Sequence, residues 1–384
     1  MDPFSPEMEP PPWYPADDGE AFRAAVRLSL VVGVGPRIRR TLLERFGSAQ
    51  AVFAAAPGEL REVKGIGTTL LRRILDAERE IDVEAELALC RKHEICVALE
   101  TDADYPRMLR EIHDPPGVLF VRGELKPADA LAVAIVGTRH GTQYGLRQAE
   151  RLGASLARAG FTVVSGLARG IDAAAHRGAL AAGGRTLAVL AGGVLNVYPP
   201  EHVSLAAEAS RQGAVLSEAP PLFQPLAGGF PQRNRLISGL SLGVIVVEAA
   251  TRSGALITAR HAMEQGREVF TVPGSVESRT SRGCHRLLRD GATLVETADD
   301  VLEQLGPLVE AAPRDDGPPV RHPAELQLNE VEQQVLAAIG PEPTPIDQVV
   351  VDSGLPVPQV LSILSVLEMR RLVRRLSGAV VART

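Results

Sequence analysis

Two arginines of this chain, Arg139 and Arg169, each follow a glycine turn at the end of an apolar run. An apolar run followed by a helix is typical of a buried parallel strand. Ligands of parallel sheets bind beyond the carboxyl ends of the strands. We therefore expect both turns to open onto one crevice, where helix N-termini and the two arginines form an anion site. The residues predicted from these turns are Gly137, Thr138, Arg139, Ser165, Gly166, Arg169 and Gly170.

A second set of phosphate-suited residues follows further along the chain. The segment FPQRNRLISGLS places two arginines and an asparagine at the start of a predicted helix, and RSGALITA follows the strand LGVIVVEA. Ser253 is expected to be the N-cap of the helix in the second segment. Phe230 offers a ring for base stacking, although a phenylalanine beside a proline also suits a core. The residues predicted from this set are Phe230, Arg233, Asn234, Arg235, Arg252 and Ser253.

The motifs of familiar nucleotide enzymes are missing from the sequence. The pattern G-x-x-x-x-G-K-[ST] does not occur, and neither glycine turn reads G-x-G-x-x-G, the dinucleotide fingerprint. His176, His261 and His285 lack metal-ligand spacing, so we expect no metal and no cofactor. Asp172 and His176, four residues apart on a predicted helix, suit either a catalytic dyad or a helix-capping acid. We expect a binding protein and not an enzyme.

The composition suits a cytoplasmic protein that is acidic overall. Its net charge is -6, and all but three of its 41 basic residues are arginine. Arginine suits phosphate contact and base stacking, although genomic base composition produces the same bias. The three cysteines have no paired spacing, and no apolar run reaches the length of a membrane span. We expect no membrane contact.

The N-terminal part of the sequence predicts an acidic, proline-rich disordered tail over residues 1–19 and a small helical domain over residues 20–80. The helical domain holds two similar units, Leu28–Ser48 and Leu60–Ala77, each with a glycine turn between two helices. It resembles the tandem helix-hairpin-helix of SAM-like DNA-binding modules. Such turns expose backbone N–H groups to a phosphate; the alternative is a packing module that serves as a spacer or protein contact.

The remaining sequence predicts two further domains. Residues 81–309 alternate strands and helices, which indicates an α/β fold with an extended Rossmann-like, doubly wound, mainly parallel sheet. Residues 310–323 form a polar, proline-rich linker. Residues 324–384 are predicted to form three helices and a β-hairpin, the pattern of a winged helix. Weak duplex DNA contact, partner docking and a purely structural cap are all open for this last domain.

An ordered set of short motifs lies between Asp104 and Ala292. The motifs are IVGTR…YG, SGLARGIDAAAH, LAGGV…VYP, LSEAP, FPQRNRLISGLS, VVEAATRSGALITA, REVFTVPG and SRGCHRLLRDGA. Together they resemble the DNA-processing protein A family of natural transformation, and both flanking domains agree with architectures of that family. The resemblance places the family's DNA-contact arginine on Arg139, its Ser-Gly turn on Ser165 and Gly166, and its R-N-R segment on Arg233–Arg235.

The resemblance implies a protein that binds single-stranded DNA, dimerises through its Rossmann-like domain, protects incoming strands and loads the RecA recombinase on them. Gly141 departs from the family pattern, which loosens the loop but leaves Arg139 in place. One alternative is a phosphoribohydrolase of the lysine-decarboxylase-like class, with Glu248 acting on a ribose. Its P-G-G-x-G-T-x-x-E signature is not completed by Pro273-Gly274-Ser275. Another is a protein adaptor for which DNA contact is incidental.

Overall fold

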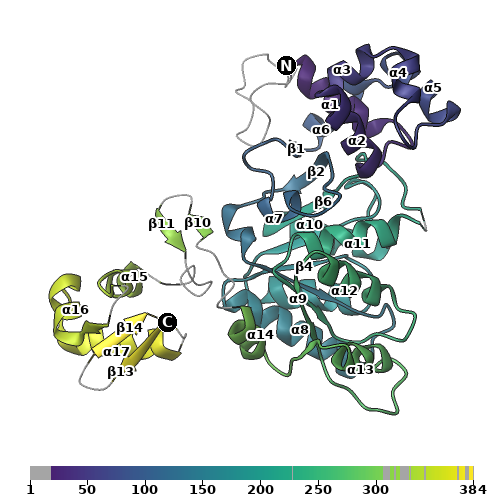
Figure 1. Cartoon of the computed structure of the whole chain (residues 1–384). Helices are drawn as coiled ribbons and strands as arrows, with labels where there is room; N and C mark the ends of the chain where they lie inside the picture. Colours follow the sequence, from purple (N-terminus) through teal and green to yellow (C-terminus); the bar gives the residue numbers. More distant parts are fainter. Residues whose placement is uncertain are drawn as a thin grey trace, which may run out of the picture.

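The computed structural model describes residues 19–226, 228–305, 312–314, 317–320, 328, 330–340, 343–369, 372–376 and 380–383 (Figure 1). A helical domain, a large α/β domain and a small C-terminal unit follow one another along the chain. The predicted tail, residues 1–19, lies outside the described residues except for Gly19, which precedes the first helix.

The helical domain contains five helices with a core of their own. They are α1 (Glu20–Leu30), α2 (Pro36–Phe46), α3 (Ala49–Ala54), α4 (Pro57–Arg61) and α5 (Thr68–Glu80). The two glycine turns join α1 to α2 and α4 to α5, and Gly35 and Gly67 are the N-caps of α2 and α5. The predicted tandem of helical hairpins is confirmed.

A nine-stranded sheet forms the centre of the large domain. Its strands are β1 (Ile95–Leu99), β2 (Val118–Gly123), β3 (Ala132–Val136), β4 (Thr162–Ser165), β5 (Thr186–Val189), β6 (Gly213–Ser217), β7 (Gly243–Val246), β8 (Glu268–Thr271) and β9 (Thr293–Leu294). Their order is β1-β2-β6-β5-β4-β3-β7-β8-β9, and only the pairs β1–β2 and β2–β6 are antiparallel. The order reverses between β3 and β7, so this sheet is doubly wound and mainly parallel, as predicted.

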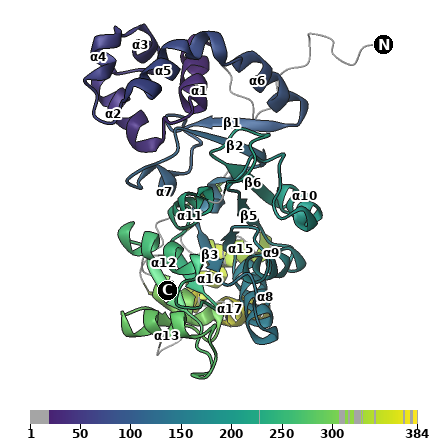
Figure 2. The same cartoon turned by 90° about the vertical axis from the view of Figure 1, so that its right-hand side faces the viewer.

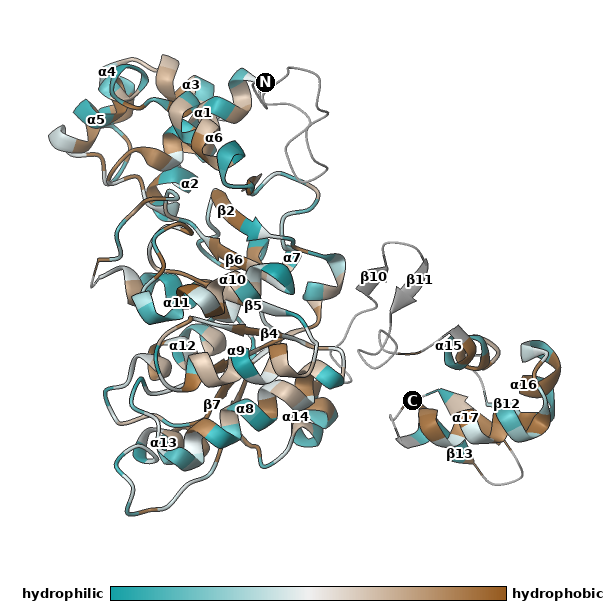
Figure 3. Ribbon diagram, turned by 180° about the vertical axis from the view of Figure 1, so that it is seen from behind, coloured by the Kyte–Doolittle hydropathy of each residue, from teal (hydrophilic) through white to brown (hydrophobic). Residues whose placement is uncertain are grey.

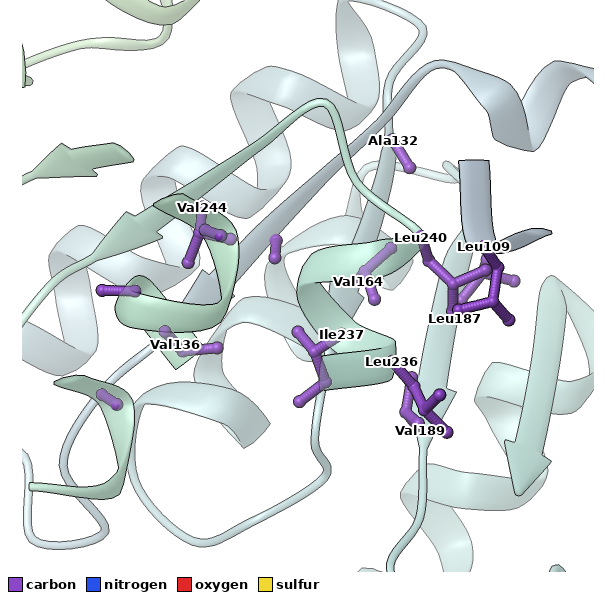
Figure 4. Packing of buried hydrophobic residues seen from close by; sticks show 14 of the residues in the cluster. Leu109, Ala132, Val136, Val164, Leu187, Val189, Leu236, Ile237, Leu240 and Val244 are labelled. Carbon is purple, nitrogen blue, oxygen red and sulfur yellow. The ribbon is translucent and has the colours of Figure 1, made fainter. Parts of the chain in front are cut away.

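Helices cover both faces of the sheet. They are α6 (Val83–Lys92), α7 (Arg107–Arg110), α8 (Gln143–Arg158), α9 (Ile171–Ala181), α10 (Val203–Arg211), α11 (Gly229–Gly239), α12 (Gly254–Glu264), α13 (Arg282–Arg289) and α14 (Ala298–Leu305), with 3-10 turns η1 (Pro127–Ala130) and η2 (Pro200–His202). Successive residues of β3 face opposite layers. Ala132 and Val136 pack with α11 and α12 (Figure 4), whereas Val133 and Ile135 pack with α8 and α9. The hydrophobic strands therefore lie inside, between helices that turn hydrophilic residues outward (Figure 3).

The helical domain joins the sheet at the edge formed by β1 and β2 (Figure 2). Phe22 and Val26 of α1 belong to the same buried cluster as Val97 of β1 and Phe120 of β2. The two domains therefore share a hydrophobic core at this edge.

Two arginines of α2 also contact the large domain. Arg39 is buried and forms an ion pair with Glu100, and Arg40 donates to the carbonyl of His113 at 3.2 Å. Both follow the first glycine turn of the helical domain. This geometry favours a protein contact as the role of α2 over phosphate binding, because both guanidinium groups already have partners.

The C-terminal unit has its own core and a three-stranded sheet of order β12-β14-β13. Its elements are α15 (Glu330–Ala337), β12 (Thr344–Pro345), α16 (Ile346–Ser353), α17 (Val357–Met369), β13 (Val373–Leu376) and β14 (Val380–Arg383). The winged-helix prediction is confirmed, although β12 was not predicted. Within the predicted linker, the strands β10 (Ala312–Arg314) and β11 (Gly317–Val320) pair antiparallel.

No single helix in the described part of the chain has the length and apolar character needed to cross a membrane. The bent pair formed by α16 and α17 meets the length and composition criteria together.

Candidate nucleic-acid interface

The predicted crevice lies at the switch point, where β3 has β4 on one side and β7 on the other. The turn after β3, Gly137–Gly141, packs directly on the turn after β4, Gly166–Gly170. Gly170 has a φ of +76°, and a Cβ atom there would lie 2.3 Å from the carbonyl oxygen of Thr138, so only glycine fits. The N–H of Thr138 donates to the carbonyl of Glu248 at 2.7 Å. Backbone contacts thus hold the three strand ends together.

Arg139 projects from the first turn over an aromatic ring. Its guanidinium carbon lies 4.9 Å from the ring centroid of Phe230, a cation–π contact. The Phe230 ring meets Tyr198 edge-on, with centroids 5.9 Å apart and planes at 61°. These three side chains and Arg169 line one small pocket, and both arginines are exposed. A planar cation beside aromatic rings suits the stacking of a nucleobase next to its phosphate.

The N-terminus of α8 is occupied by a side chain of the protein itself. Glu248 is 3% exposed and accepts hydrogen bonds from the backbone N–H and the hydroxyl of Thr142, at 2.9 and 2.6 Å. Gly145 makes room for this carboxylate, because a Cβ atom there would lie 2.4 Å from its Oε2 atom. The prediction that this helix N-terminus faces an anionic ligand is therefore wrong, since Glu248 takes the place of that anion.

Asp172 plays a similar part in the second turn. Its buried carboxylate accepts a hydrogen bond from the N–H of Ala168 at 3.4 Å. Burial raises the pKa of Asp172, and the positive charge of Arg233 opposes this rise. His176 instead hydrogen-bonds to the hydroxyl of Thr186 at 2.7 Å. The structure thus favours the capping acid over the catalytic dyad.

Arg233 and Asn234 lie beneath the crevice. Arg233 is 5% exposed, and its guanidinium donates to the carbonyls of Gly166, at 2.8 Å, and of Val189. The Asn234 amide donates to the carbonyl of Gly254 at 3.2 Å. The prediction that these side chains extend an exposed positive rim is wrong, because both donate hydrogen bonds to backbone carbonyls below it. They brace the ends of β4 and β5 and the start of α12.

Arg235 lies on the other side of α11. It is 5% exposed and forms ion pairs with Asp114, at 3.2 Å, and Glu218, at 2.5 Å. Its predicted place on the rim is wrong, because two carboxylates hold its charge away from the crevice.

The other predicted residues divide between supports and exposed groups. The buried hydroxyl of Ser165 donates to the carbonyl of Ile135 at 2.6 Å, which makes it a support. Ser253 accepts a hydrogen bond from the N–H of Ala255 at 3.3 Å, so its prediction as the N-cap of α12 is confirmed. Arg252 is exposed on the turn after β7. The exposed cations of the predicted set are therefore Arg139, Arg169 and Arg252.

Two residues at the crevice were not predicted. Tyr198 stands against Phe230, and the carboxylate of Glu201 accepts a hydrogen bond from Arg169. Tyr198 belongs to the motif VYP in the loop after β5, and Glu201 follows this motif in the 3-10 turn η2. The aromatic residue in that motif was the available signal, whereas the ion pair of Glu201 depends on tertiary structure alone.

Metal-ligating side chains do not cluster in the described ranges, where no group of three or more His, Cys, Asp or Glu residues is placed to hold an ion. The cysteines Cys90, Cys96 and Cys284 are free thiols. Burial raises the pKa of Cys96 to about 11, so this thiol stays protonated near neutral pH.

Three family models match successive parts of the chain. A SAM-like helix-hairpin-helix tandem matches residues 27–80, and a DprA winged helix domain matches residues 318–379. Between them, the model of DNA recombination-mediator protein A matches residues 96–306, more than half of the chain. The chain belongs to the DNA recombination-mediator protein A family. The resemblance seen in the sequence motifs is thereby confirmed.

Relatives of this family match along most of the chain. Protein Smf of Synechocystis is 34% identical, over 91% of this chain and 96% of the relative. Protein Smf of Escherichia coli is 43% identical, over 72% of this chain and 74% of the relative. The X-ray structure of DNA processing protein A from Streptococcus pneumoniae is 36% identical with a TM-score of 0.65, and the match covers 73% of this chain and 97% of that one.

Proposed function

We propose that this member of the DNA recombination-mediator protein A family binds single-stranded DNA in the crevice without chemical turnover. In natural transformation it protects incoming single strands and loads the RecA recombinase on them, as a homodimer formed through the α/β domain. The family description and the names of its DNA-processing relatives support DNA as the ligand.

The observation that carries this proposal is the exposed Arg139 guanidinium stacked on Phe230. Arginine contacts any phosphate and an aromatic ring stacks with any base, so this pair suits binding that tolerates all sequences. Arg169, Arg139 and Arg252 follow the three adjacent strands β4, β3 and β7. Adjacent strands lie about 4.8 Å apart, so a row of cations of this kind suits a polymer better than one nucleotide.

The alternative of a nucleotide-processing enzyme is not favoured by the geometry. Its candidate carboxylate, Glu248, is buried, and Thr142 donates a hydrogen bond to each of its two oxygens. A group engaged in this way does not reach a ribose in the crevice. Release of free base from nucleoside monophosphates would instead support this enzymatic function.

The replacement Arg139→Ala tests the proposed site. We expect oligothymidine binding to weaken by about 1–3 kcal/mol, the range for one stacking or bidentate contact, or about 5- to 150-fold in Kd. The slope of log K against log salt should become shallower by about 0.7, because one phosphate contact is lost. Fluorescence anisotropy at several salt concentrations measures both quantities.

Arg139→Lys is the matched control, because it keeps the charge and loses the planar group over Phe230. It should retain the salt slope and lose part of the affinity. Unchanged binding by Arg139→Ala would remove Arg139 from the site.

The assembly proposals have separate tests. A strict monomer in sedimentation at micromolar concentration would refute the homodimer. Binding of duplex DNA with and without residues 324–384 tests a duplex contact by the C-terminal unit. A pull-down of RecA that survives both nuclease treatment and Arg139→Ala would favour the adaptor as the main role.

A further inference from the structure

Arg169 differs from Arg139 in what its guanidinium group contacts. Its Nε atom donates to the carboxylate of Glu201, and both side chains are about half exposed, at 47% and 50%. The hydrogen bond raises the pKa of Arg169 and lowers the pKa of Glu201, as expected for an ion pair. Arg139 lies on a neutral ring, so its charge is available, whereas the charge of Arg169 is balanced by Glu201.

The ion pair stands at the mouth of the crevice. Arg169 lines the same pocket as Arg139 and Phe230, and it directly precedes Gly170, which packs on the first turn. Glu201 comes from η2, a different element, which lies just before α10. The Glu201 carboxylate therefore pairs with a cation that lines the proposed path of the DNA strand.

We propose that Glu201 masks a phosphate subsite at Arg169, and that a phosphodiester of the bound single strand replaces the Glu201 carboxylate on the guanidinium. This inference rests on the proposed function, since it names a contact within the same crevice. Glu201 thus acts through its ion pair with Arg169 and lowers the affinity of the crevice for the strand.

The exchange is physically reasonable for two reasons. Ion pairs between half-exposed side chains contribute little stability, so another anion displaces the carboxylate easily. A phosphodiester presents oxygens of the same charge and similar geometry to the arginine fork. Once displaced, the carboxylate stays close to the phosphate and repels it, so the exchange costs affinity that a neutral residue would return.

The substitution Glu201→Gln tests the proposal in the full chain, with oligothymidine as the probe. We expect binding to tighten about two- to fivefold, the usual worth of one exposed ion pair. The slope of log K against log salt should steepen by up to about 0.7. In the unmodified chain the freed Glu201 carboxylate takes up a counterion when the phosphate replaces it, whereas the glutamine takes up none. Thermal unfolding should be unchanged, since both side chains are half exposed.

Two variants separate this effect from a change in net charge. Glu208→Gln removes the same charge from an exposed position on α10 and should leave affinity almost unchanged. Without Arg169, the substitution Glu201→Gln should bring no gain in affinity. Arg169→Gln and Arg169→Gln/Glu201→Gln should therefore bind oligothymidine equally well.

The outcomes separate the masked subsite at Arg169 from the binding of single-stranded DNA in the crevice. Tighter binding that requires Arg169 supports the masked subsite. An equal gain in Glu208→Gln, or a gain that persists without Arg169, overturns it and leaves the proposed function intact. Failure of the unmodified chain to bind oligothymidine would overturn both.

Discussion

Replacing Arg233 by methionine tests the buried arrangement under the crevice. Methionine fills the volume of the aliphatic stem and removes the charge and the N–H donors. Those donors reach the carbonyls of Gly166 and Val189, which would be left without their partner. Burial lowers the pKa of Arg233 to about 10, and the charge of the buried Asp172 opposes this, so each charge stabilises the other.

We expect Arg233→Met to lower the free energy of unfolding by about 3–5 kcal/mol, because removal of one partner leaves a buried charge uncompensated. The double variant Arg233→Met/Asp172→Asn should recover about 2 kcal/mol of this loss, since the amide carries no charge. The remainder reflects the two carbonyls that stay unpaired. Urea unfolding measures both values, provided that the dependence on urea has the same slope in each variant.

Oligothymidine binding then separates a brace from a DNA contact. A lost brace weakens affinity without changing the slope of log K against log salt, because no phosphate contact disappears. A lost phosphate contact makes that slope shallower by about 0.7. Unchanged stability of Arg233→Met together with a shallower salt slope would refute the reasoning and return Arg233 to the rim.

Two further changes test the supports of the site. In Gly145→Ala the new Cβ would lie 2.4 Å from Glu248, so we expect the carboxylate to leave Thr142. The free energy of unfolding should fall by about 1–3 kcal/mol, and oligothymidine binding should weaken. Gly254→Ala is the neutral control, because its Cβ meets open space. His176 is neutral in the fold, because burial lowers its pKa from 6.5 to about 3. Its contribution to stability is therefore complete above pH 6.5 and is lost as the pH falls toward 3, by about 2 kcal/mol between pH 7 and pH 5. Urea unfolding of His176→Leu should show a flatter pH profile, and an unchanged profile would contradict this assignment.

The strands and helices around the crevice could be predicted from local patterns. The apolar runs that end in Gly137 and Gly166 predicted the strands β3 and β4, which finish directly before these glycines. The two arginines and the asparagine of FPQRNRLISGLS were expected at the start of a helix, but α11 begins earlier, at Gly229. Pro231 lies in the first turn, where its missing N–H has no partner to lose, so the proline does not stop the helix.

The direction of the arginine side chains could not be read from the same patterns. Arg233 and Arg235 are two residues apart, and a helix turns by about 100° per residue, so their side chains leave α11 on nearly opposite sides. That spacing was itself a signal against a shared rim. The use of Glu248 by Thr142 joins residues 106 positions apart, and only the folded chain shows it.

The shared core between α1 and the β1–β2 edge, with Phe22 packed near Phe120, has a mechanical consequence. A boundary at residue 80 separates the two domains in the sequence and cuts through continuous packing in the molecule. The helical domain is consequently fixed to the α/β domain and not joined to it by a flexible linker. Any partner that docks on α4 or α5 is therefore held at a fixed distance and direction from Arg139. The helical domain thus sets the spacing between that partner and the DNA strand in the crevice.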